Sequence, residues 1–306
     1  MKDDRRVISV PVATVWTSFD SPRKEDHSYL SANSKVDCWI KSQSYDQLLN
    51  LCEDNRVQTQ VLFGEEVIVQ EERGEWCSVL IPGQPSSKHV AGYPGWIPTS
   101  LLSHRKGESE ELPLAIVESK QAALLFNDGT EWKVSYATFF GVAGMNGDQV
   151  IVHTARGLAQ VLKKDVSLYP SYETIEGKTG KDLILSAEAF LGLPYLWGGT
   201  SGFGYDCSGF TYSICRANGK IIPRDAHDQA GQGKTVPLDR LEPGDLLFFA
   251  YEEGQGAIHH VAFYYGDGRI IHAPKTGKTV EIIPLAGMEY ERELCAARRY
   301  IAEGLQ

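Results

Sequence analysis

Turn-forming residues that recur at short intervals constrain the first half of this chain more than any other feature. Glycines and a proline-rich turn separate apolar runs of strand length, over residues 7–16, 57–63, 66–70 and 76–81. The same pattern resumes after the middle of the chain, with Asp-Gly at 128–129 and Asn-Gly at 146–147 as hairpin signals. This spacing predicts two small all-β barrels, over residues 1–103 and 112–170.

Three departures from that pattern complete the predicted organisation. Residues 35–52 have near-helical apolar spacing, with Ser44 as a helix N-cap, which predicts a helical insertion in the first barrel. Residues 103–111 are polar and charged and suit a linker. From residue 176 to 303 the pattern becomes α+β, with expected helices and strands at 182–191, 208–217, 258–265, 269–273, 280–283 and 294–300.

Composition narrows the partners and the compartment. The 306 residues carry a net charge of −10, which argues against nucleic acid or an anionic membrane as the main partner. No window approaches 18 continuous apolar residues, so no transmembrane helix is expected. The six cysteines form no CxxC pair and the first residues lack a signal-peptide pattern, which favours a reducing cytoplasm. We expect a monomer without cofactor or metal.

Cys207 is the candidate nucleophile. It lies among turn-forming residues directly before an apolar helical pattern over 208–217. A thiol at a helix N-terminus gains thiolate character from the free N–H groups and the helix dipole. The other reading is a buried structural cysteine, but glycines and polar residues flank this position rather than core residues.

His260 and His272 are the candidate partners of that cysteine. They lie six residues on either side of Gly266, in a predicted hairpin that turns at 266–268. If the loop has three residues, the numbers of two residues paired across the hairpin add up to 534. His260 and His272 then lie on the same face of the sheet, diagonally opposite each other on neighbouring strands. A two-residue loop would break that parity. His260 would be the general base and His272 would orient it, whereas His259 would face the other way; a metal site would lack a third ligand.

At this point the sequence resembles the NlpC-type papain-like cysteine peptidases of bacterial cell-wall metabolism. Six motifs in order carry the resemblance: LPYLWGGT at 193–200, DCSGF at 206–210, PRD at 223–225, EPGDLLFF at 242–249, HV at 260–261 and IHAP at 271–274. In the first half, residues 58–67 and 92–96 resemble a narrower group, the γ-D-glutamyl-L-diamino acid endopeptidases (dipeptidyl-peptidase VI), in which bacterial SH3-like barrels precede the peptidase domain. The expected fold is therefore an α+β papain-like domain after two SH3-like barrels.

The resemblance implies a substrate and roles for residues near Cys207. The substrate would be a murein peptide with free N-terminal L-Ala, cut after γ-D-Glu at L-Lys or meso-diaminopimelate. Tyr195 matches the oxyanion-hole tyrosine, and Asp206 matches the acid that meets the substrate ammonium group. The remaining expected contacts are Ser208 and Arg224 on the D-Glu α-carboxylate, Asp225 as a tether, and Trp197 beside Tyr195. Ala226 replaces a serine common in relatives.

In the narrower group the first SH3-like domain also closes one end of the cleft. Tyr93 matches its tyrosine, and Glu65 would supply a second acid to the substrate amine. Two acids facing one ammonium group would make the enzyme release dipeptides rather than cut intact wall.

Two alternatives remain open. One is a secreted hydrolase that cuts intact stem peptides, which would need a signal peptide and an open cleft. The other is a wall-binding adaptor with an inactive peptidase domain, which would need a broken catalytic set, although Cys207, His260 and His272 are all present.

Overall fold

The computed structural model describes residues 4–32, 35–104, 112–175 and 178–301. The chain separates into two compact units, Met1–Thr174 with Ser201–Phe203, and Ile175–Thr200 with Gly204–Gln306. Most of the predicted linker (residues 105–111) and the ends of the third predicted domain (176–177 and 302–303) lie outside the described residues. No helix in the described ranges is long and apolar enough to cross a membrane.

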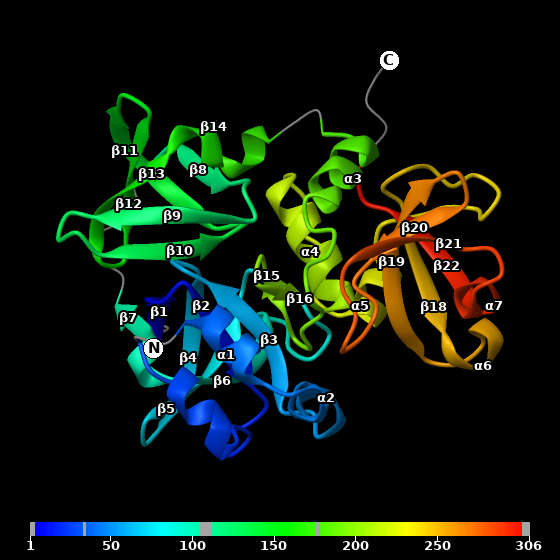
Figure 1. The fold of residues 1–306 in the computed structure, drawn as a ribbon, viewed down its shortest axis with the longest axis horizontal. Coiled ribbons are helices and arrows are strands. Elements are labelled where there is room, and N and C mark those ends of the chain that lie inside the picture. Colours follow the sequence, from blue (N-terminus) through cyan, green and yellow to red (C-terminus); the bar gives the residue numbers. More distant parts are fainter. Residues whose placement is uncertain (1–3, 33–34, 105–111, 176–177, 302–306) are drawn as a thin grey trace. The chain divides into compact units, whose positions relative to one another are not determined.

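The first unit begins with a seven-stranded sheet (Figure 1). Its spatial order is β3-β2-β6-β5-β4-β1-β7. The strands are β1 (Asp4–Ile8), β2 (Val12–Trp16), β3 (Val57–Leu62), β4 (Glu66–Arg73), β5 (Trp76–Ile81), β6 (Tyr93–Pro98) and β7 (Leu102–His104). The single strand expected over 7–16 is wrong: Pro11 has no N–H for a ladder, and the chain breaks there into β1 and β2. β7 also occupies the expected start of the linker.

The helical insertion is confirmed as α1 (Val36–Ser42) and α2 (Tyr45–Glu53). Ser44 caps α2 as expected, because its hydroxyl accepts a hydrogen bond from the Gln47 N–H at 3.2 Å and the Gln47 side chain accepts from the Ser44 N–H. This reciprocal capping box ends the preceding segment and starts the second helix.

A second seven-stranded sheet follows in the same unit, in the order β10-β9-β13-β12-β11-β8-β14. Its strands are β8 (Leu114–Val117), β9 (Gln121–Phe126), β10 (Glu131–Ser135), β11 (Phe139–Asn146), β12 (Gln149–Thr154), β13 (Gly157–Leu162) and β14 (Val166–Tyr169). The two predicted hairpin signals lie at its turns, Asp128-Gly129 between β9 and β10 and Asn146-Gly147 between β11 and β12. The seventh, β14, follows a one-turn helix rather than a Gly-containing turn, so the turn pattern did not reveal it.

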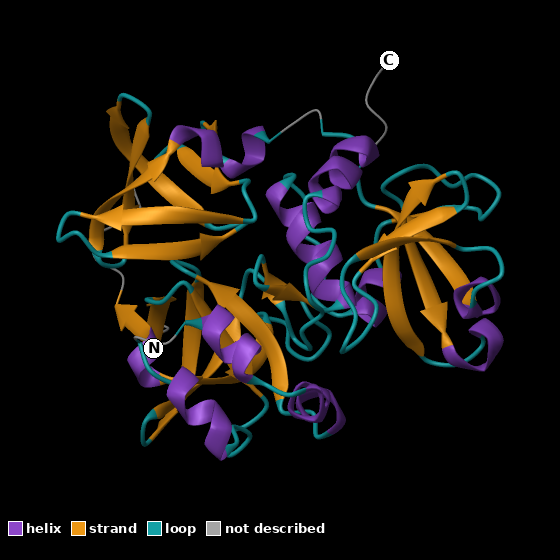
Figure 2. Cartoon of the chain, in the orientation of Figure 1, coloured by secondary structure: helices purple, strands orange, loops and turns teal. Residues whose placement is uncertain are grey.

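The second unit packs helices against a six-stranded antiparallel sheet (Figure 2). The sheet order is β17-β22-β18-β19-β20-β21. The elements are α3 (Gly180–Glu188), β15 (Thr200–Ser201), β16 (Gly204–Tyr205), α4 (Cys207–Ala217), α5 (Ala226–Ala230), β17 (Lys234–Thr235), β18 (Leu246–Ala250), α6 (Tyr251–Gly254), β19 (Ile258–Gly266), β20 (Arg269–His272), β21 (Glu281–Pro284), α7 (Glu289–Glu293) and β22 (Leu294–Arg299).

Helix α4 lies at the centre of this unit. Nearly all of its residues are buried, and Phe210 contacts both Phe190 and Phe263 of β19 through edge-on aromatic packing. A helix that is apolar on most sides has to be enclosed, and this enclosure fixes the position of its first turn. The first turn of α4 is where Cys207 lies.

Candidate active site

Asp206 and Gly209 determine how Cys207 is presented. Asp206 has extended backbone geometry and caps α4, its Oδ1 accepting a hydrogen bond from the Gly209 N–H at 2.6 Å. Gly209 has to lack a side chain, because a Cβ there would lie 2.0 Å from the Gly199 carbonyl oxygen. The Asp-Cys-Ser-Gly segment therefore folds as a capped turn that places the thiol at the first position of the helix.

The thiol of Cys207 lies in an environment that differs from the expected one. It accepts hydrogen bonds from the N–H groups of Val261 and Ser208. Burial, followed by the neighbouring Asp206 carboxylate, raises the pKa of the Cys207 thiol to about 12. The N–H of Ser208 at the helix N-terminus favours the thiolate, as expected, but desolvation and the adjacent acid outweigh it.

The two histidines meet on the β19–β20 hairpin as predicted. Nε2 of His260 lies 2.8 Å from Nδ1 of His272, and both side chains are buried. Phe263 pairs with Ile271, which confirms the sum of 534. The turn itself has two residues, Asp267 and Gly268, both with positive φ.

A bulge explains why the short turn does not separate the histidines. The register shifts by one residue between Tyr264 and Gly266. One extra residue on β19 compensates for one missing residue in the loop, so the parity is restored. The face shared by His260 and His272 therefore depends on this bulge.

Burial favours the neutral form of both imidazoles. It lowers the pKa of His260 well below the usual value, with His272 and His259 adding to the effect. It also lowers the pKa of His272 to about 4. Since Nε2 of His260 contacts His272, Nδ1 is the nitrogen left for Cys207. His259 binds Glu293 instead, at 3.2 Å.

Arg224 is joined to the first turn of α4 rather than exposed to solvent. Its guanidinium donates to both oxygens of Asp206, at 3.2 and 2.6 Å, and to the Ser208 hydroxyl at 2.9 Å. Arg224 is 1% exposed and Asp206 is 6% exposed. This fork geometry orients the carboxylate that precedes the nucleophile. Arg224 therefore has little surface to offer a substrate, contrary to the direct contact expected from the resemblance.

Gln229 is a site residue that the sequence did not single out. It is fully buried, and its amide N–H groups donate to the carbonyl oxygens of Ser208 and Pro223, at 3.1 and 2.8 Å. Its own oxygen accepts from the Thr211 hydroxyl at 2.8 Å. Gln229 thus ties the chain next to Arg224 to the first turn of α4. Only the Pro-Arg-Asp motif nearby could have drawn attention to it.

Tyr195 and Trp197 lie on the segment that leads to β15. Tyr195 is buried and its N–H donates to the Lys278 carbonyl at 2.9 Å. Its backbone also forms an isolated bridge with Tyr205, two residues before Cys207. Trp197 is half-buried. The Tyr195 backbone is therefore held next to the segment that carries the thiol.

Tyr290 of α7 also belongs to the site. Its ring stacks on His260 at 5.0 Å between centroids and meets His272 edge-on at 5.2 Å. Burial, followed by the nearby Cys207, raises the pKa of Tyr290 to about 12. No motif pointed to it, because the contact arises only when α7 folds back onto the hairpin.

Two expected site residues, Tyr93 and Glu65, belong to the first unit. The Tyr93 side chain is buried, contacts the Lys88 ammonium group, and donates to the Gln58 side chain at 3.5 Å. Glu65 is half-buried and follows Gly64, whose positive φ makes the turn into β4. Their part in substrate binding stays a prediction.

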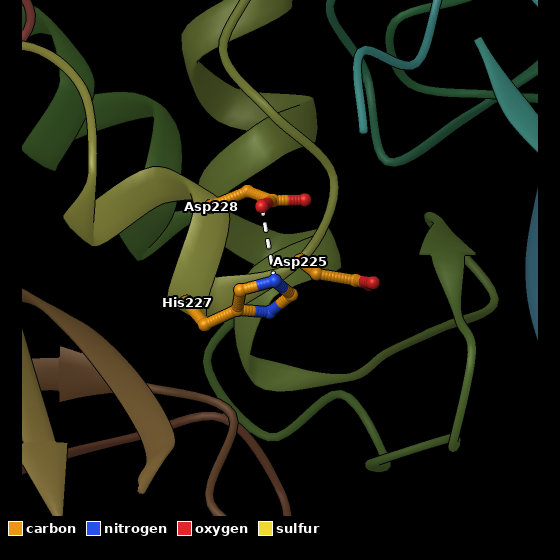
Figure 3. A group of neighbouring side chains, drawn as sticks. All are labelled: Asp225, His227 and Asp228. Atoms are coloured by element: carbon orange, nitrogen blue, oxygen red, sulfur yellow. Dashed lines mark ion pairs between the residues drawn. The ribbon is translucent and has the colours of Figure 1, made fainter. Parts of the chain in front are cut away.

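Asp225 lies with His227 and Asp228 at α5 (Figure 3). Their ligand atoms are within 4.8 Å of one another, a spacing that could hold a metal ion. His227 and Asp228 already form an ion pair at 3.0 Å. That pair accounts for the grouping without a metal. The expected role of Asp225 as a tether stays a prediction.

The assembled groups suit acyl transfer to sulfur. The thiol at the helix terminus accepts a hydrogen bond from the N–H of Val261, the residue that follows His260, and His260 is itself paired with His272. A thiol, an imidazole on the adjoining strand and a second imidazole that orients the first are the parts of a cysteine hydrolase. The model of the NlpC/P60 family matches residues 192–299, which include all of these groups.

Comparison with known proteins extends the likeness over the whole chain. The γ-D-glutamyl-L-lysine dipeptidyl-peptidase of Bacillus subtilis (strain 168) is 48% identical over 294 residues, which cover 95% of this chain and 97% of that protein. The protein of the same name from Bacillus cereus (strain ATCC 10987 / NRS 248) is 41% identical and covers 98% of this chain and 92% of its own length.

A solved structure of a related protein agrees with these two sequence comparisons. The crystal structure of an NlpC/P60 family protein from Bacillus cereus ATCC 10987 superimposes with a TM-score of 0.95 at 39% identity, covering 98% of this chain and 100% of that chain. With the family match around Cys207 and near-complete coverage by these relatives, this chain belongs to the NlpC/P60 family and is a cysteine peptidase.

Proposed function

We propose that this enzyme hydrolyses the bond between γ-D-Glu and a diamino acid in murein peptides with a free N-terminal L-Ala, releasing L-Ala-γ-D-Glu. The observation that carries the proposal is the 48% identity over 95% of the chain to a γ-D-glutamyl-L-lysine dipeptidyl-peptidase. That identity extends beyond the peptidase unit into both seven-stranded sheets. It also supports assigning those sheets as SH3-like barrels.

Cys207 is the nucleophile of the proposed reaction. Its sulfur attacks the γ-carbonyl carbon of D-Glu while Nδ1 of His260 takes the thiol proton. The Tyr195 hydroxyl and the Cys207 N–H stabilise the tetrahedral oxyanion. The C–N bond then breaks, and the leaving amine takes the proton from His260. Water hydrolyses the thioester with His260 again as base, and the thiol is regenerated.

His272 is important for the proton transfer because Cys207 and His260 are both uncharged before the reaction. Burial raises the pKa of the Cys207 thiol and lowers that of His260, so each group alone favours its neutral form. Transfer of the proton creates an imidazolium in a buried place, where a charged group needs a hydrogen-bond partner. His272, at 2.8 Å, is that partner.

Asp206 is the proposed contact for the substrate ammonium group. Its Oδ1 already accepts hydrogen bonds from Gly209, Ser208 and Arg224, whereas Oδ2 accepts one, from Arg224. A carboxylate oxygen has two lone pairs, so Oδ2 retains capacity for an ammonium N–H. We assign Arg224 to holding Asp206 and Ser208 in place. The D-Glu α-carboxylate is assigned to the Ser208 hydroxyl, whose single hydrogen would leave its long bond to Asp206 Oδ1, at 3.3 Å, for the substrate.

We place the reaction in a reducing compartment, as part of murein peptide recycling. None of the six cysteines, all of which the structure describes, forms a disulfide, and two of them, Cys38 and Cys295, are exposed. Proteins of oxidising compartments rarely retain so many cysteines outside disulfides.

The test is cleavage of L-Ala-γ-D-Glu-L-Lys, of its N-acetylated form and of the meso-diaminopimelate analogue, by the wild type and by Cys207→Ala. We expect cleavage of the free peptides only, and none by the variant. Equal cleavage of the acetylated peptide would contradict amine recognition and favour a hydrolase of intact stem peptides. Cleavage of none would favour the adaptor alternative.

A further inference from the structure

One nitrogen of the histidine pair lacks a partner. His272 is 0% exposed, and its Nε2 finds no hydrogen-bond partner among the residues that the structure describes. A buried, unsatisfied polar nitrogen is unfavourable and calls for a specific explanation.

The chemistry of the pair determines which proton this nitrogen carries. When His260 has taken the thiol proton, both of its nitrogens carry hydrogen, and Nε2–H has to donate to His272. Nδ1 of His272, 2.8 Å away, is then an acceptor and carries no hydrogen. The single proton of a neutral His272 must therefore reside on Nε2. Any group that accepts a hydrogen bond from Nε2–H selects the tautomer that the reaction requires.

Glu281 is placed to accept it. β20 and β21 are antiparallel, and His272 pairs directly with Glu281. Oε1 of Glu281 lies 3.7 Å from Nε2 of His272, slightly beyond hydrogen-bond length. The Glu281 side chain is 41% exposed, so it can rotate by the remaining distance without repacking the core.

We propose that Glu281 is a positioning residue for the reaction: its carboxylate accepts the hydrogen bond from Nε2–H of His272, fixes the tautomer, and stabilises the imidazolium that forms on His260. The active array would then run from Cys207 through the two histidines to Glu281. This inference rests on the proposed function of Cys207 and His260.

Titratable groups on the neighbouring elements determine the controls. They are Asp206 at the N-cap of α4, Cys207 on α4, His259 and His260 on β19, Lys275 and Lys278 between β20 and β21, and Glu289, Tyr290 and Glu293 on α7. Glu293 is paired with His259 and is unsuitable as a control. Glu289 is exposed, lies next to Tyr290 in sequence, and carries the same charge. Glu289→Gln is therefore the matched variant.

The test is the pH dependence of kcat/KM on L-Ala-γ-D-Glu-L-Lys for the wild type, Glu281→Gln, Glu281→Ala and Glu289→Gln. Removing a nearby negative charge makes the imidazolium less favourable and the thiolate more favourable, so both limbs of the profile move to lower pH. We expect a shift of about half a pH unit in both Glu281 variants. We expect kcat/KM at the optimum to fall about tenfold in Glu281→Ala, and less in Glu281→Gln, whose amide oxygen can still accept. Glu289→Gln should match the wild type.

Unshifted limbs in both Glu281 variants would overturn the proposal, whatever the loss of activity. An equal shift in Glu289→Gln would overturn it as well, since the effect would then be one of general charge. Nitrogen-15 NMR of His272 provides a readout that needs no turnover: Nε2–H in the wild type and mixed tautomers in Glu281→Ala. If the wild type is inactive, the proposed function fails, and the NMR result alone decides whether Glu281 fixes the tautomer.

Discussion

The two buried polar groups that flank Cys207 differ in how completely they are satisfied. On the α4 side, Arg224, Asp206 and Gln229 form a network of charge-assisted and amide hydrogen bonds. On the hairpin side, His260 and His272 share one hydrogen bond and leave a buried nitrogen without a partner among the described residues. The first group fixes positions, whereas the second retains the freedom to move a proton.

In this cysteine peptidase, incomplete hydrogen bonding among the described residues occurs at the histidine pair that transfers the proton and not in the network that positions Cys207. A network with many buried hydrogen bonds resists rearrangement, because breaking any bond leaves a buried polar atom unpaired. A pair of neutral imidazoles can accept a charge for the lifetime of an intermediate, provided that a further acceptor is near. Variants in the two groups should therefore differ in how strongly they affect stability.

Arg224→Met should have the largest effect on stability. It leaves the Asp206 carboxylate buried without its cation, which lowers the free energy of unfolding by about 3–5 kcal/mol. Urea unfolding followed by circular dichroism measures this. The double variant Arg224→Met with Asp206→Asn should recover a large part of the loss, since no uncompensated charge remains. A loss under about 1 kcal/mol in the single variant would show that the network is not the rigid part of the site.

His272→Asn should weaken the dependence of the free energy of unfolding on pH. The pKa of His272 is about 4 in the folded protein, below the ordinary value of 6.5. The unfolded chain therefore binds the proton first, and stability falls as the pH is lowered from 6.5 towards 4, by about 3 kcal/mol for this group. Unfolding free energies at pH 7 and pH 4.5 should differ less in the variant than in the wild type. Identical differences would contradict the assignment of a buried neutral imidazole.

Gln229→Leu should have a moderate effect. The Ser208 and Pro223 carbonyls lose their donor, which lowers the free energy of unfolding by about 1–3 kcal/mol. The matched control is Gln232→Leu, since Gln232 is exposed and three residues away. Its effect should stay within about 0.5 kcal/mol. If both variants unfolded alike, Gln229 would not be the link between the two segments.

Tyr290→Phe should have the smallest effect. The contacts with the two histidines are made by the ring, which phenylalanine retains. Tyr290→Leu loses the aromatic geometry, and with it roughly 1 kcal/mol of interaction. Comparing kcat/KM and thermal midpoints of both variants separates the ring from the hydroxyl. A larger loss in Tyr290→Phe than in Tyr290→Leu would assign a role to the hydroxyl instead.

The sequence predicted the parts of the site that local pattern controls. The capped turn before α4 and the shared face of His260 and His272 follow from turn residues and strand parity. The turn has two residues, the length expected to break the parity, but the bulge near Gly266 restores it. The thiol environment was not predictable, because desolvation of Cys207 depends on how the rest of the unit encloses it.

Sequence patterns did not identify the residues that act through tertiary contacts. Gln229 and Tyr290 lie on helices of five residues, too short to give a periodic signal. Glu281 lies opposite His272 because β20 pairs with β21. The length of the loop between these strands does not define their register, so the sequence did not predict this contact. The division of the strand expected over 7–16 depended on a single proline within an otherwise regular pattern.

Cys207, positioned by the hydrogen-bond network of Arg224 and Gln229 and deprotonated by the histidine pair, is expected to form a thioester with the substrate. The most direct measurement is mass spectrometry of the wild-type enzyme quenched in acid during turnover of L-Ala-γ-D-Glu-L-Lys, followed by digestion. We expect an adduct equal to L-Ala-γ-D-Glu less one water on the peptide that contains Cys207. An adduct on another cysteine, or undiminished release of lysine by Cys207→Ala, would contradict it.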